Sequence, residues 1–301
     1  MQLFGKEIIL ADKVCVRVAG GAAKNGSAGL MNRPFVNLYV KITDRCNAHC
    51  PFCCNGTRHH LSSTSFDTDK LLHIIREIVG NGIKLNRISL TGGEPGLCPD
   101  IVSDLLQRIS ESEECAFTQV QLNTNGLNRD SRMLMHHRRL DSISLSLHHY
   151  DVDKLSELYG HSVDFNPLAG ITDISDKLNI SCNLIKGYID SAAEIEKMLY
   201  YAAANGIKTV GFVSLMQKNR YCQERFVDFR QIDLSAISAL ILSGERALPN
   251  ICGCSNYLFY AKDNMMEVYF RINENTMYCG SSLLYDGVYL RQGFNNDNII
   301  Y

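Results

Sequence analysis

From residue 35 onward, hydrophobic positions follow two alternating patterns along the chain. Short apolar runs of the kind that form buried strands are separated by segments in which apolar residues return every three or four positions, as in amphipathic helices. Residues 68–79 show the helical spacing clearly and end at Gly80, a residue type that often closes a helix. The runs predict strands at residues 36–42, 87–90, 118–122, 142–147, 180–185 and 209–215. The periodic segments predict helices at residues 68–79, 100–109, 129–136, 166–178, 192–204 and 234–242.

These elements make six strand-then-helix units, the pattern of an α/β fold with a parallel sheet that is either open or curled into a barrel. Ligands of such folds bind at the carboxyl ends of the strands. Residues 1–34 form an N-terminal extension, in which the Gly-, Ala- and Ser-rich residues 19–30 read as a loop without the Gly-Lys-Ser/Thr ending of a phosphate-binding loop. We expect one unit at residues 35–248 and a small β-rich region at residues 249–301, with strand-like runs at residues 257–261, 266–271, 276–279 and 287–290.

The composition argues against several classes of protein. The 301 residues carry a formal net charge of −2, which is too balanced to attract nucleic acid or an anionic membrane. No apolar run approaches the ~18–20 residues that a bilayer-spanning helix needs. The first residues lack the basic and apolar regions of a signal peptide. We therefore expect a cytoplasmic protein without a membrane or nucleic-acid partner.

Twelve cysteines are unusual in a chain of this kind. In a reducing compartment, clustered cysteines usually bind metal or carry out redox chemistry, and structural disulfides are rare. Four cysteines lie within residues 46–54 and three more within residues 252–279. These two groups predict two sites, while the scattered cysteines are expected to be small buried hydrophobes.

The first group, Cys46-x3-Cys50-x2-Cys53, follows the first predicted strand directly. This spacing allows a single loop to place three thiolates around one metal centre. A structural zinc site takes four protein ligands, and His49 or Cys54 could supply the fourth only from a strained position in the same loop. Three thiolates with an open coordination position are better explained by an iron–sulfur cluster.

Two motifs together resemble those of the radical S-adenosylmethionine (SAM) superfamily. Cys-x3-Cys-x-aromatic-Cys follows the first strand, and Thr-Gly-Gly-Glu-Pro, residues 91–95, follows the second. The resemblance covers about residues 35–215 and implies an incomplete, TIM-like (β/α)6 barrel, in agreement with the six units. It also implies a [4Fe–4S] cluster held by Cys46, Cys50 and Cys53, with SAM on the fourth iron, and an electron donor of the flavodoxin or ferredoxin type.

The same resemblance implies a SAM pocket beside the cluster. Phe52 would lie against the adenine, and Glu94 would accept a hydrogen bond from the amino group of SAM. Gly92 and Gly93 would allow the backbone to approach the methionine moiety, because a Cβ would collide with it.

Two further positions match the superfamily locally. Residues 144–147 resemble the strand whose serine holds the SAM ribose, which selects Ser146, and residues 212–216 resemble the last strand, where the backbone of Met216 would meet the adenine. The alternative is that both are ordinary strand-end residues. In the family reaction, one electron from the reduced cluster splits the sulfonium of SAM, and the resulting 5′-deoxyadenosyl radical removes hydrogen from an unactivated carbon.

Within the superfamily, residues 43–47 and 212–216 most resemble the branch that contains the GTP cyclase of molybdopterin synthesis. That branch and the related twitch and SPASM enzymes hold an auxiliary cluster in a cysteine-rich C-terminal extension. Cys252, Cys254 and Cys279 lie in the corresponding region and imply a second [4Fe–4S] cluster, which Cys222 could complete. A zinc clip and three unconnected buried thiols are the alternatives.

The chain departs from the GTP cyclase at several points. Its first C-terminal cysteine pair is Cys-x-Cys where the cyclase has Cys-x2-Cys, and it lacks the terminal Gly-Gly. Where the cyclase uses two arginines and a lysine on GTP, this chain has Tyr39, Ser89 and Asn179. Losing three cations would remove several charge-assisted bonds of ~1.5–3 kcal/mol each. We therefore do not expect GTP to be the substrate.

Other polar residues are weaker candidates for catalysis. His148 and His149 follow the strand that carries Ser146 and could bind substrate or move a proton, although loop polarity also explains them. The basic residues 136–139 follow a predicted helix and are expected to be solvated. Similarly weak candidates for the barrel mouth are Tyr150, Lys186, Arg220 and Arg225.

Three functions are compatible with the sequence. The first is an enzyme that abstracts hydrogen from a small molecule such as a sugar, cyclitol, nucleoside or amino-acid derivative. The second is a peptide-modifying enzyme, an epimerase or crosslink former, although about 34 residues before the barrel are too few for the peptide-recognition domain of many such relatives. The third is a non-catalytic iron–sulfur or zinc scaffold, which would have no need for the intact glycine turn.

Overall fold

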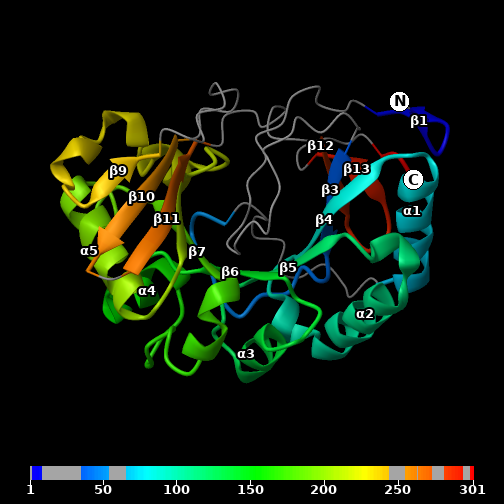
Figure 1. Ribbon diagram of the computed structural model, residues 1–301, viewed down its shortest axis with the longest axis horizontal. Coiled ribbons are helices and arrows are strands. Elements are labelled where there is room, and N and C mark those ends of the chain that lie inside the picture. Colours follow the sequence, from blue (N-terminus) through cyan, green and yellow to red (C-terminus); the bar gives the residue numbers. More distant parts are fainter. Residues whose placement is uncertain are drawn as a thin grey trace.

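The computed structural model describes residues 2–8, 35–53, 66–243, 255–262, 264–272, 281–293 and 299–301. Within these residues one eleven-stranded sheet dominates the molecule, in the order β13-β12-β3-β4-β5-β6-β7-β8-β11-β10-β9. Figure 1 shows that the sheet is strongly curved and that helices α1 to α5 lie along its outer face. The opposite, concave face looks toward the middle of the molecule.

Six neighbouring strands run parallel in chain order and form the centre of the sheet. They are β3 (Phe35–Lys41), β4 (Lys84–Thr91), β5 (Gln119–Thr124), β6 (Ser142–Ser146), β7 (Leu178–Leu184) and β8 (Thr209–Ser214). The helices that follow them are α1 (Thr68–Gly80), α2 (Pro99–Glu111), α3 (Arg129–Met135), α4 (Val152–Tyr159), α5 (Ala192–Ala204) and α6 (Arg220–Glu224). Short 3₁₀ helices lie in the connections: η1 (Pro95–Leu97), η2 (Glu113–Cys115), η3 (Thr172–Lys177), η4 (Phe229–Gln231) and η5 (Leu234–Ala236).

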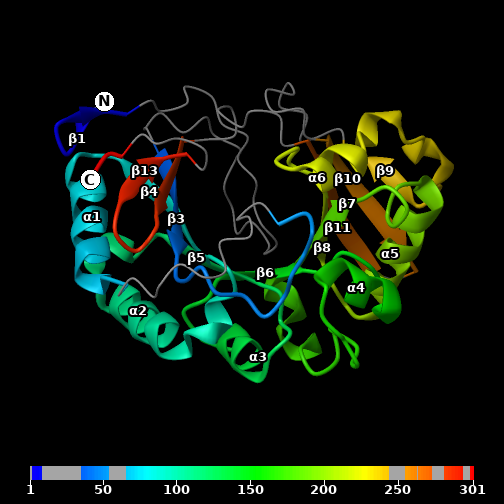
Figure 2. The ribbon, with the colours of Figure 1, turned by 180° about the vertical axis from the view of Figure 1, so that it is seen from behind.

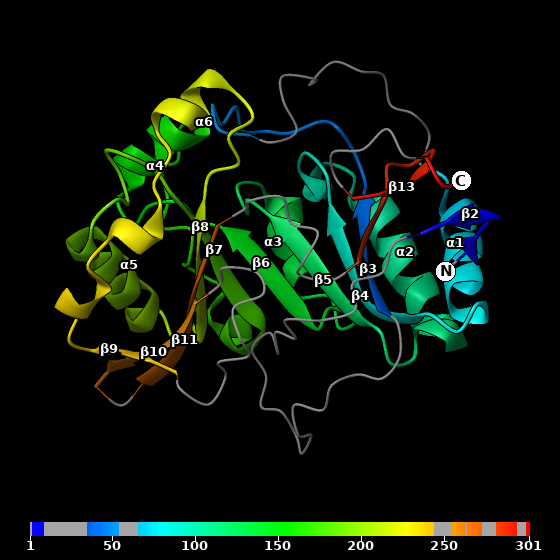
Figure 3. The same cartoon turned by 90° about the horizontal axis from the view of Figure 1, so that it is seen from above.

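The hydrophobic core lies between the sheet and the helices. In β4, Ile88 and Leu90 are fully buried, and α1 contributes Leu71, Ile74 and Ile78 at helical spacing. Because side chains alternate along a strand, the residues between the apolar ones point to the concave face. Seen from above in Figure 3, the strands form an arc with the helices outside it. The apolar side chains of these strands therefore face the helices, and the polar side chains between them face the concave side.

The predicted α/β fold with a mostly parallel sheet is confirmed, and each of the six predicted strands is present within three residues at either end. The helix predicted at residues 166–178 is wrong. That segment contains Pro167 and a left-handed Gly170 (φ 72°), and it forms only η3. The helix after β6 is instead α4, where the Asp151 side chain caps the first turn by accepting from the N–H groups of Asp153 and Lys154.

The helix predicted at residues 234–242 is also wrong. This segment forms η5 and then the short edge strand β9 (Leu240–Leu242), which pairs antiparallel with β10. Its apolar spacing fits a helix as well as a strand, and pairing with a distant strand decides the outcome. Within the described ranges, no helix combines the length and the apolar character needed to cross a membrane.

The C-terminal strands extend the sheet at both edges. β10 (Ser255–Ala261) and β11 (Asn264–Arg271) form an antiparallel pair, and β11 lies parallel beside β8. β12 (Ser281–Tyr285) lies parallel beside β3 and pairs with β13 (Leu290–Gln292).

The four strand-like runs expected in this region are confirmed only in part. Those at residues 257–261 and 266–271 are confirmed. The run at residues 287–290 is wrong, because the Asp286 side chain accepts from the N–H groups of Val288 and Tyr289 in a turn. The run at residues 276–279 lies outside the described residues, as does the loop expected at residues 19–30.

The two ends of the chain meet beside α1. β1 (Gln2–Leu3) and β2 (Lys6–Glu7) form a small antiparallel pair. The Phe4 ring stacks on Tyr301 with centroids 4.1 Å apart, and Lys6 Nζ donates to the carbonyl of Ile299 (2.6 Å). Figure 2 shows the two termini on the same side of the molecule, near β12 and β13.

Candidate metal centre

The cysteine loop, residues 42–53, follows β3 at the carboxyl edge of the sheet. Contacts from two distant elements hold it. The N–H of His49 donates to the carbonyl of Tyr159 at the end of α4 (2.6 Å), and Nδ2 of Asn219, before α6, donates to the carbonyl of Pro51 (3.0 Å). The loop is therefore fixed over the carboxyl ends of the parallel strands.

Cys46, Cys50 and Cys53 are partly buried in this loop and influence one another electrostatically. Burial, followed by the charges of Cys53 and Cys46, raises the pKa of the Cys50 thiol to about 12. Burial is also the first cause of the raised pKa of Cys46. Three neighbouring thiolates in such a place need a positive partner, and a thiolate-bound metal supplies one.

Three cysteines are fewer ligands than a structural zinc ion takes. Among the residues that the structure describes, no three His, Cys, Asp or Glu side chains converge on one ion. A [4Fe–4S] cluster needs no such convergence, because each cysteine binds a different iron. Three thiols in one loop therefore fit a cluster better than a zinc ion. Cys54, a candidate fourth zinc ligand, lies outside the described residues.

The turn after β4 packs directly on the cysteine loop. The N–H of Gly93 donates to the carbonyl of Thr43 (2.7 Å), and the N–H of Glu94 donates to the carbonyl of Arg45 (2.8 Å). A Cβ on Gly93 would overlap the backbone of Arg45, and one on Gly92, which has a φ of 145°, would overlap that of Thr43. The glycines were predicted to admit the methionine moiety. In the structure the atoms nearest to their missing side chains belong to the cysteine loop, so the two motifs form one joined unit.

The Glu94 carboxylate, only 1% exposed, is a buried centre of hydrogen bonds. Its Oε1 accepts from the N–H of Gly96 (3.0 Å) and from the hydroxyls of Thr124 (2.6 Å) and Ser131 (2.8 Å). Its Oε2 accepts from the N–H of Asn125 (2.8 Å) and keeps a second lone pair. Burial raises the pKa of the carboxyl, and the four hydrogen bonds oppose that rise. The carboxylate ties the turn after β4 to the end of β5 and to α3.

Asn125 extends this network to the cysteine loop. Its Nδ2 donates to Oδ1 of Asn47 (2.8 Å) and lies 3.8 Å from Sγ of Cys46, while its Oδ1 accepts from the N–H of Leu127 (2.9 Å). An amide fixed at both ends and directed at a cysteine sulfur resembles the groups that orient and tune metal ligands in other proteins. In the sequence, the pair Asn125-Gly126 indicates only the turn that ends a strand, so this role was missed.

Phe52 and His148 meet beside the loop. Their rings are nearly perpendicular, with centroids 4.9 Å apart, and both are buried. Burial lowers the pKa of His148 to about 4, and its Nδ1 accepts from the N–H of Asn183 (3.2 Å). Sγ of Cys222 lies 3.7 Å from the carbonyl of Phe52. The ring of Phe52 therefore has a fixed place at the edge of the candidate site.

Ser146 and Met216 lie at the same edge of the sheet. Ser146 is the last residue of β6, and its carbonyl accepts a hydrogen bond from the Tyr159 hydroxyl. Met216 follows β8 by two residues, and its carbonyl accepts from the N–H of Lys218 (2.7 Å). The parallel sheet thus brings both residues to the edge that carries the cysteine loop and the turn after β4.

His149 has different surroundings from His148. It packs against Tyr150, with centroids 4.5 Å apart, and its Nδ1 accepts from the N–H of Asp151 (2.9 Å). Its Nε2 lies 3.9 Å from the Glu194 carboxylate, to which the Tyr150 hydroxyl donates (2.7 Å). His149 therefore belongs to a cluster at the starts of α4 and α5.

The other weak candidates make local contacts. Arg220 pairs with Glu224 one turn later in α6 (2.6 Å), and both side chains are exposed. Nη1 of Arg225 donates to the carbonyl of Lys186 (2.9 Å). In the basic segment, His136 lies 3.3 Å from Asp173 at the surface. None of these contacts includes a residue of the cysteine loop.

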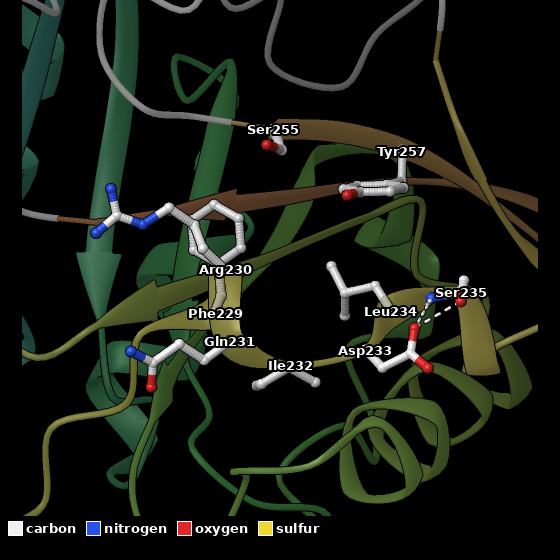
Figure 4. A pocket seen from close by; sticks show the side chains of 9 residues that line it. All are labelled: Phe229, Arg230, Gln231, Ile232, Asp233, Leu234, Ser235, Ser255 and Tyr257. Carbon is white, nitrogen blue, oxygen red and sulfur yellow. Dashed lines mark hydrogen bonds between the residues drawn. The ribbon is translucent and has the colours of Figure 1, made fainter.

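Two regions lie apart from this site. Cys252, Cys254 and Cys279 fall outside the described residues. A surface hollow of about 560 Å³ lies between residues 229–235 and the start of β10, as Figure 4 shows. Phe229, Leu234 and Tyr257 line its apolar part, and the Asp233 carboxylate accepts from the N–H and hydroxyl of Ser235. The hollow shares no residue with the cysteine loop or with the turn after β4.

Comparisons with known proteins agree with this geometry. The family model of the radical SAM superfamily matches residues 40–229. The chain is 28% identical over 167 residues to the GTP 3′,8-cyclase of Aquifex aeolicus, which covers 53% of this chain and 51% of the relative. It is 26% identical over 223 residues to molybdenum cofactor biosynthesis protein 1 of Drosophila melanogaster, which covers 71% of this chain and 37% of that protein. The chain thus spans about half or less of the length of these relatives.

Among solved structures, the chain is similar to SuiB from Streptococcus suis bound to S-adenosylmethionine. Its TM-score is 0.49 at 20% identity, over 62% of this chain and 42% of that chain. The family match itself covers more than half of this chain and includes the cysteine loop, the turn after β4 and strands β4 to β8. This chain belongs to the radical SAM superfamily, as its two motifs predicted.

Proposed function

We propose that the protein is an enzyme that cleaves SAM reductively and removes a hydrogen atom from a small-molecule substrate. The observation that carries the proposal is the joining of the cysteine loop to the turn after β4, through the hydrogen bonds of Gly93 (2.7 Å) and Glu94 (2.8 Å) to the loop. A structural metal would need neither this glycine turn nor the buried carboxylate beside its ligands. Membership of the superfamily supports the same conclusion.

Cys46, Cys50 and Cys53 would hold a [4Fe–4S] cluster and leave one iron to SAM. When bound and reduced, the cluster supplies one electron to the sulfonium of SAM, which gives methionine and a 5′-deoxyadenosyl radical that takes hydrogen from the substrate. The chain itself orients the ligands, and the Nδ2 of Asn125 directed at Cys46 Sγ is one such group. We expect the electron to come from a flavodoxin- or ferredoxin-like protein.

The SAM pocket would use residues from four strand ends. Phe52, whose ring is held by His148, would lie against the adenine. The second lone pair of Glu94 Oε2 would accept from the amino group of SAM, next to the backbone of Gly92 and Gly93. Two further contacts complete the pocket, from Ser146 to the ribose and from the Met216 backbone to the adenine.

The six parallel strands, each followed by a helix, support an incomplete (β/α)6 barrel of the TIM type at residues 35–248. We propose a second [4Fe–4S] cluster on Cys252, Cys254 and Cys279, within a twitch-like region at residues 249–301 that follows the barrel. Cys222 packs against the carbonyl of Phe52 in the first loop, so we assign it no part in the second cluster.

We propose a substrate other than GTP. The three positions that correspond to GTP-binding cations of the cyclase lie in β3, β4 and β7 of this chain. Tyr39, Ser89 and Asn179 carry no positive charge, and the last two are buried. A triphosphate placed there would lose the charge-assisted hydrogen bonds that the three cations give it in the cyclase.

Anaerobic iron and sulfide analysis tests the cluster assignments. The protein is compared with a variant in which Cys46, Cys50 and Cys53 are alanine. With two clusters, the variant keeps about four irons per chain and loses 5′-deoxyadenosine formation from SAM and reductant. A variant without iron removes the second cluster from the proposal, and a variant that still forms 5′-deoxyadenosine overturns the reaction. Acceleration by peptides but not by small molecules would favour the peptide-modifying alternative.

A further inference from the structure

The concave face of the three middle strands carries an unusual set of side chains. In β5, β6 and β7 every second side chain faces the helices and is fully buried, as are Leu122, Leu145 and Cys182. The strand register then aligns the inward residues of neighbouring strands side by side. At the half-buried level nearest the carboxyl edge these inward residues are Gln121, Asn123, Ser144, Ser146, Ser181 and Asn183.

Most of these polar side chains have unused hydrogen-bonding capacity. Asn123 Nδ2 donates to the carbonyl of Leu90 (3.2 Å), which leaves its Oδ1. The side chains of the other five residues make no hydrogen bond to any residue within the described ranges. Half-buried polar side chains without a protein partner are open to water or to a ligand. The middle of the concave face thus offers several amides and hydroxyls to a bound molecule.

The same level of the sheet carries no charge on β5, β6 or β7. Lys41, at the end of β3, is engaged by the carboxylate of Asp44. Arg87 faces inward from β4, but the register places it opposite Gln119, four residues below Asn123 and so about 13 Å away along the strand. On β5, β6 and β7 a phosphate or carboxylate would therefore find neutral donors instead of the charged ones that such anions prefer. The cation at the level of Asn183 is Arg271 of β11, two strands beyond β7.

An aromatic ring borders this polar area. Gly211 of β8 lies beside Ser181, and Tyr269 of β11 lies beside Gly211. The Tyr269 ring lies so close over Gly211 that a Cβ there would overlap it. A flat ring next to a row of amides and hydroxyls suits a molecule with both an apolar C–H face and several hydroxyl groups.

We propose that the substrate is an uncharged polyhydroxylated small molecule of the sugar or cyclitol kind. It is bound on the concave face by the amides and hydroxyls of β5, β6 and β7, apart from the Ser146 hydroxyl, which would contact the SAM ribose. This inference rests on the proposed function, because hydrogen abstraction places the substrate next to SAM at the carboxyl edge. Each hydroxyl of such a molecule both donates and accepts, as do Asn, Gln and Ser side chains. An apolar substrate would leave these groups unpaired, and an anionic one would meet no cation on these three strands.

The test uses the reconstituted protein with SAM and reductant, and the probes are fractions of an extract of the source cells. The extract is separated into anion-exchange-retained, cation-exchange-retained and unretained material, and the unretained part is divided at about 1 kDa by ultrafiltration. We expect only the small unretained fraction to raise 5′-deoxyadenosine formation, by at least fivefold. Periodate, which cleaves neighbouring hydroxyl groups, should remove this effect. The same fraction should raise the melting temperature of the protein with SAM in the absence of reductant.

Variants connect the effect to the concave face. The double variant Ser144→Ala/Ser181→Ala should need at least tenfold more of the small unretained fraction for half-maximal stimulation. Ser238→Ala, an exposed serine outside this face, should stay within twofold of the unchanged protein. Stimulation by a charged or larger fraction, stimulation that survives periodate, or none above the uncoupled rate overturns the substrate proposal. Absence of 5′-deoxyadenosine under every condition instead overturns the proposed function.

Discussion

The carboxyl edge of the sheet and the concave face of its middle strands differ in how far their polar side chains are hydrogen-bonded. At the edge, Glu94 accepts four hydrogen bonds and Asn125 makes contacts through both ends of its amide. On the concave face, Ser144 and Ser181 make none within the described residues. The polar side chains of the first region pair with one another, whereas those of the second are open to water or to another molecule.

In the proposed function, the residues of the edge hold a cofactor and those of the concave face select a substrate. A cofactor site shared by a whole superfamily is built from a backbone arrangement that must be rigid before the cofactor arrives, and rigidity requires internal hydrogen bonds. A substrate site has to leave its groups unpaired until the substrate pairs them. Substitutions at the edge should therefore cost stability, and substitutions on the concave face should cost recognition.

The largest expected effect on stability is that of Gly93→Ala. The added Cβ would overlap the backbone of Arg45, so the cysteine loop or the turn after β4 must move. We expect the free energy of unfolding to fall by about 3 kcal/mol or more, with a several-fold loss of iron after reconstitution. Gly80→Ala is the matched control, because nothing lies within 4 Å of its added Cβ. It should stabilise by about 0.5–1 kcal/mol in urea unfolding. Equal effects of the two substitutions would contradict the joined unit.

Glu94→Gln should have the next largest effect. The amide can keep one oxygen for the donors at Oε1, but its NH₂ group would then face the N–H of Asn125. Two buried donors are left opposed and charge-assisted bonds are lost, which we expect to cost about 2–4 kcal/mol. Urea unfolding of the iron-free protein measures this cost apart from any effect on the cluster. An unchanged midpoint would mean that the carboxylate is not a structural centre.

His148 should make stability depend on pH in the acid range. Its folded-state pKa of about 4 lies below its ordinary value of 6.5, because burial disfavours the charged ring. Between these pH values the unfolded state binds more protons, so the free energy of unfolding falls as pH falls from 6.5 toward 4. This residue alone contributes about 3 kcal/mol to that loss. Melting temperatures across this range should decline less steeply for His148→Gln. Parallel pH profiles would show that His148 is not buried in its neutral form.

The sequence predicted the fold well where local pattern and tertiary structure agree. All six parallel strands contain the short apolar runs that predicted them. The runs are needed because every second side chain of a strand packs against the helices. The errors occur where distant contacts decide. Residues 240–242 form a strand because β10 pairs with them, and α4 starts at the cap Asp151, whereas Pro167 and Gly170 stop the helix expected later. Neither pairing partners nor their positions can be obtained from apolar spacing.

The candidate site shows a similar division. Cysteine spacing and the glycine turn identify the two motifs, because a rigid backbone arrangement needs fixed residue types at fixed spacing. Their contact with each other, and the part played by Ser131 and Asn125, depend on elements that lie 30 or more residues later in the chain. The concave face has no motif at all. Its residues are separate polar positions on different strands, and only the strand register assembles them.

The smallest effect gives the most direct test of the opening comparison, since it sets one serine against another. Ser131 is fully buried and donates to Glu94 Oε1 (2.8 Å), whereas Ser144 is half-buried and has no partner among the described residues. Ser131→Ala should lower the free energy of unfolding by about 1–3 kcal/mol, because it leaves a buried carboxylate with one donor fewer. Ser144→Ala should change it by less than about 0.5 kcal/mol, since no protein hydrogen bond is lost.

Urea unfolding of both variants, without iron or substrate, measures the difference. Adding the small unretained fraction to the protein with SAM should then reverse the order. The rise in melting temperature caused by this fraction should be smaller for Ser144→Ala than for the unchanged protein. For folded Ser131→Ala protein it should be unchanged. If Ser144→Ala costs as much stability as Ser131→Ala, the concave face is already complete within the chain, and its open hydrogen-bonding groups are not reserved for a substrate.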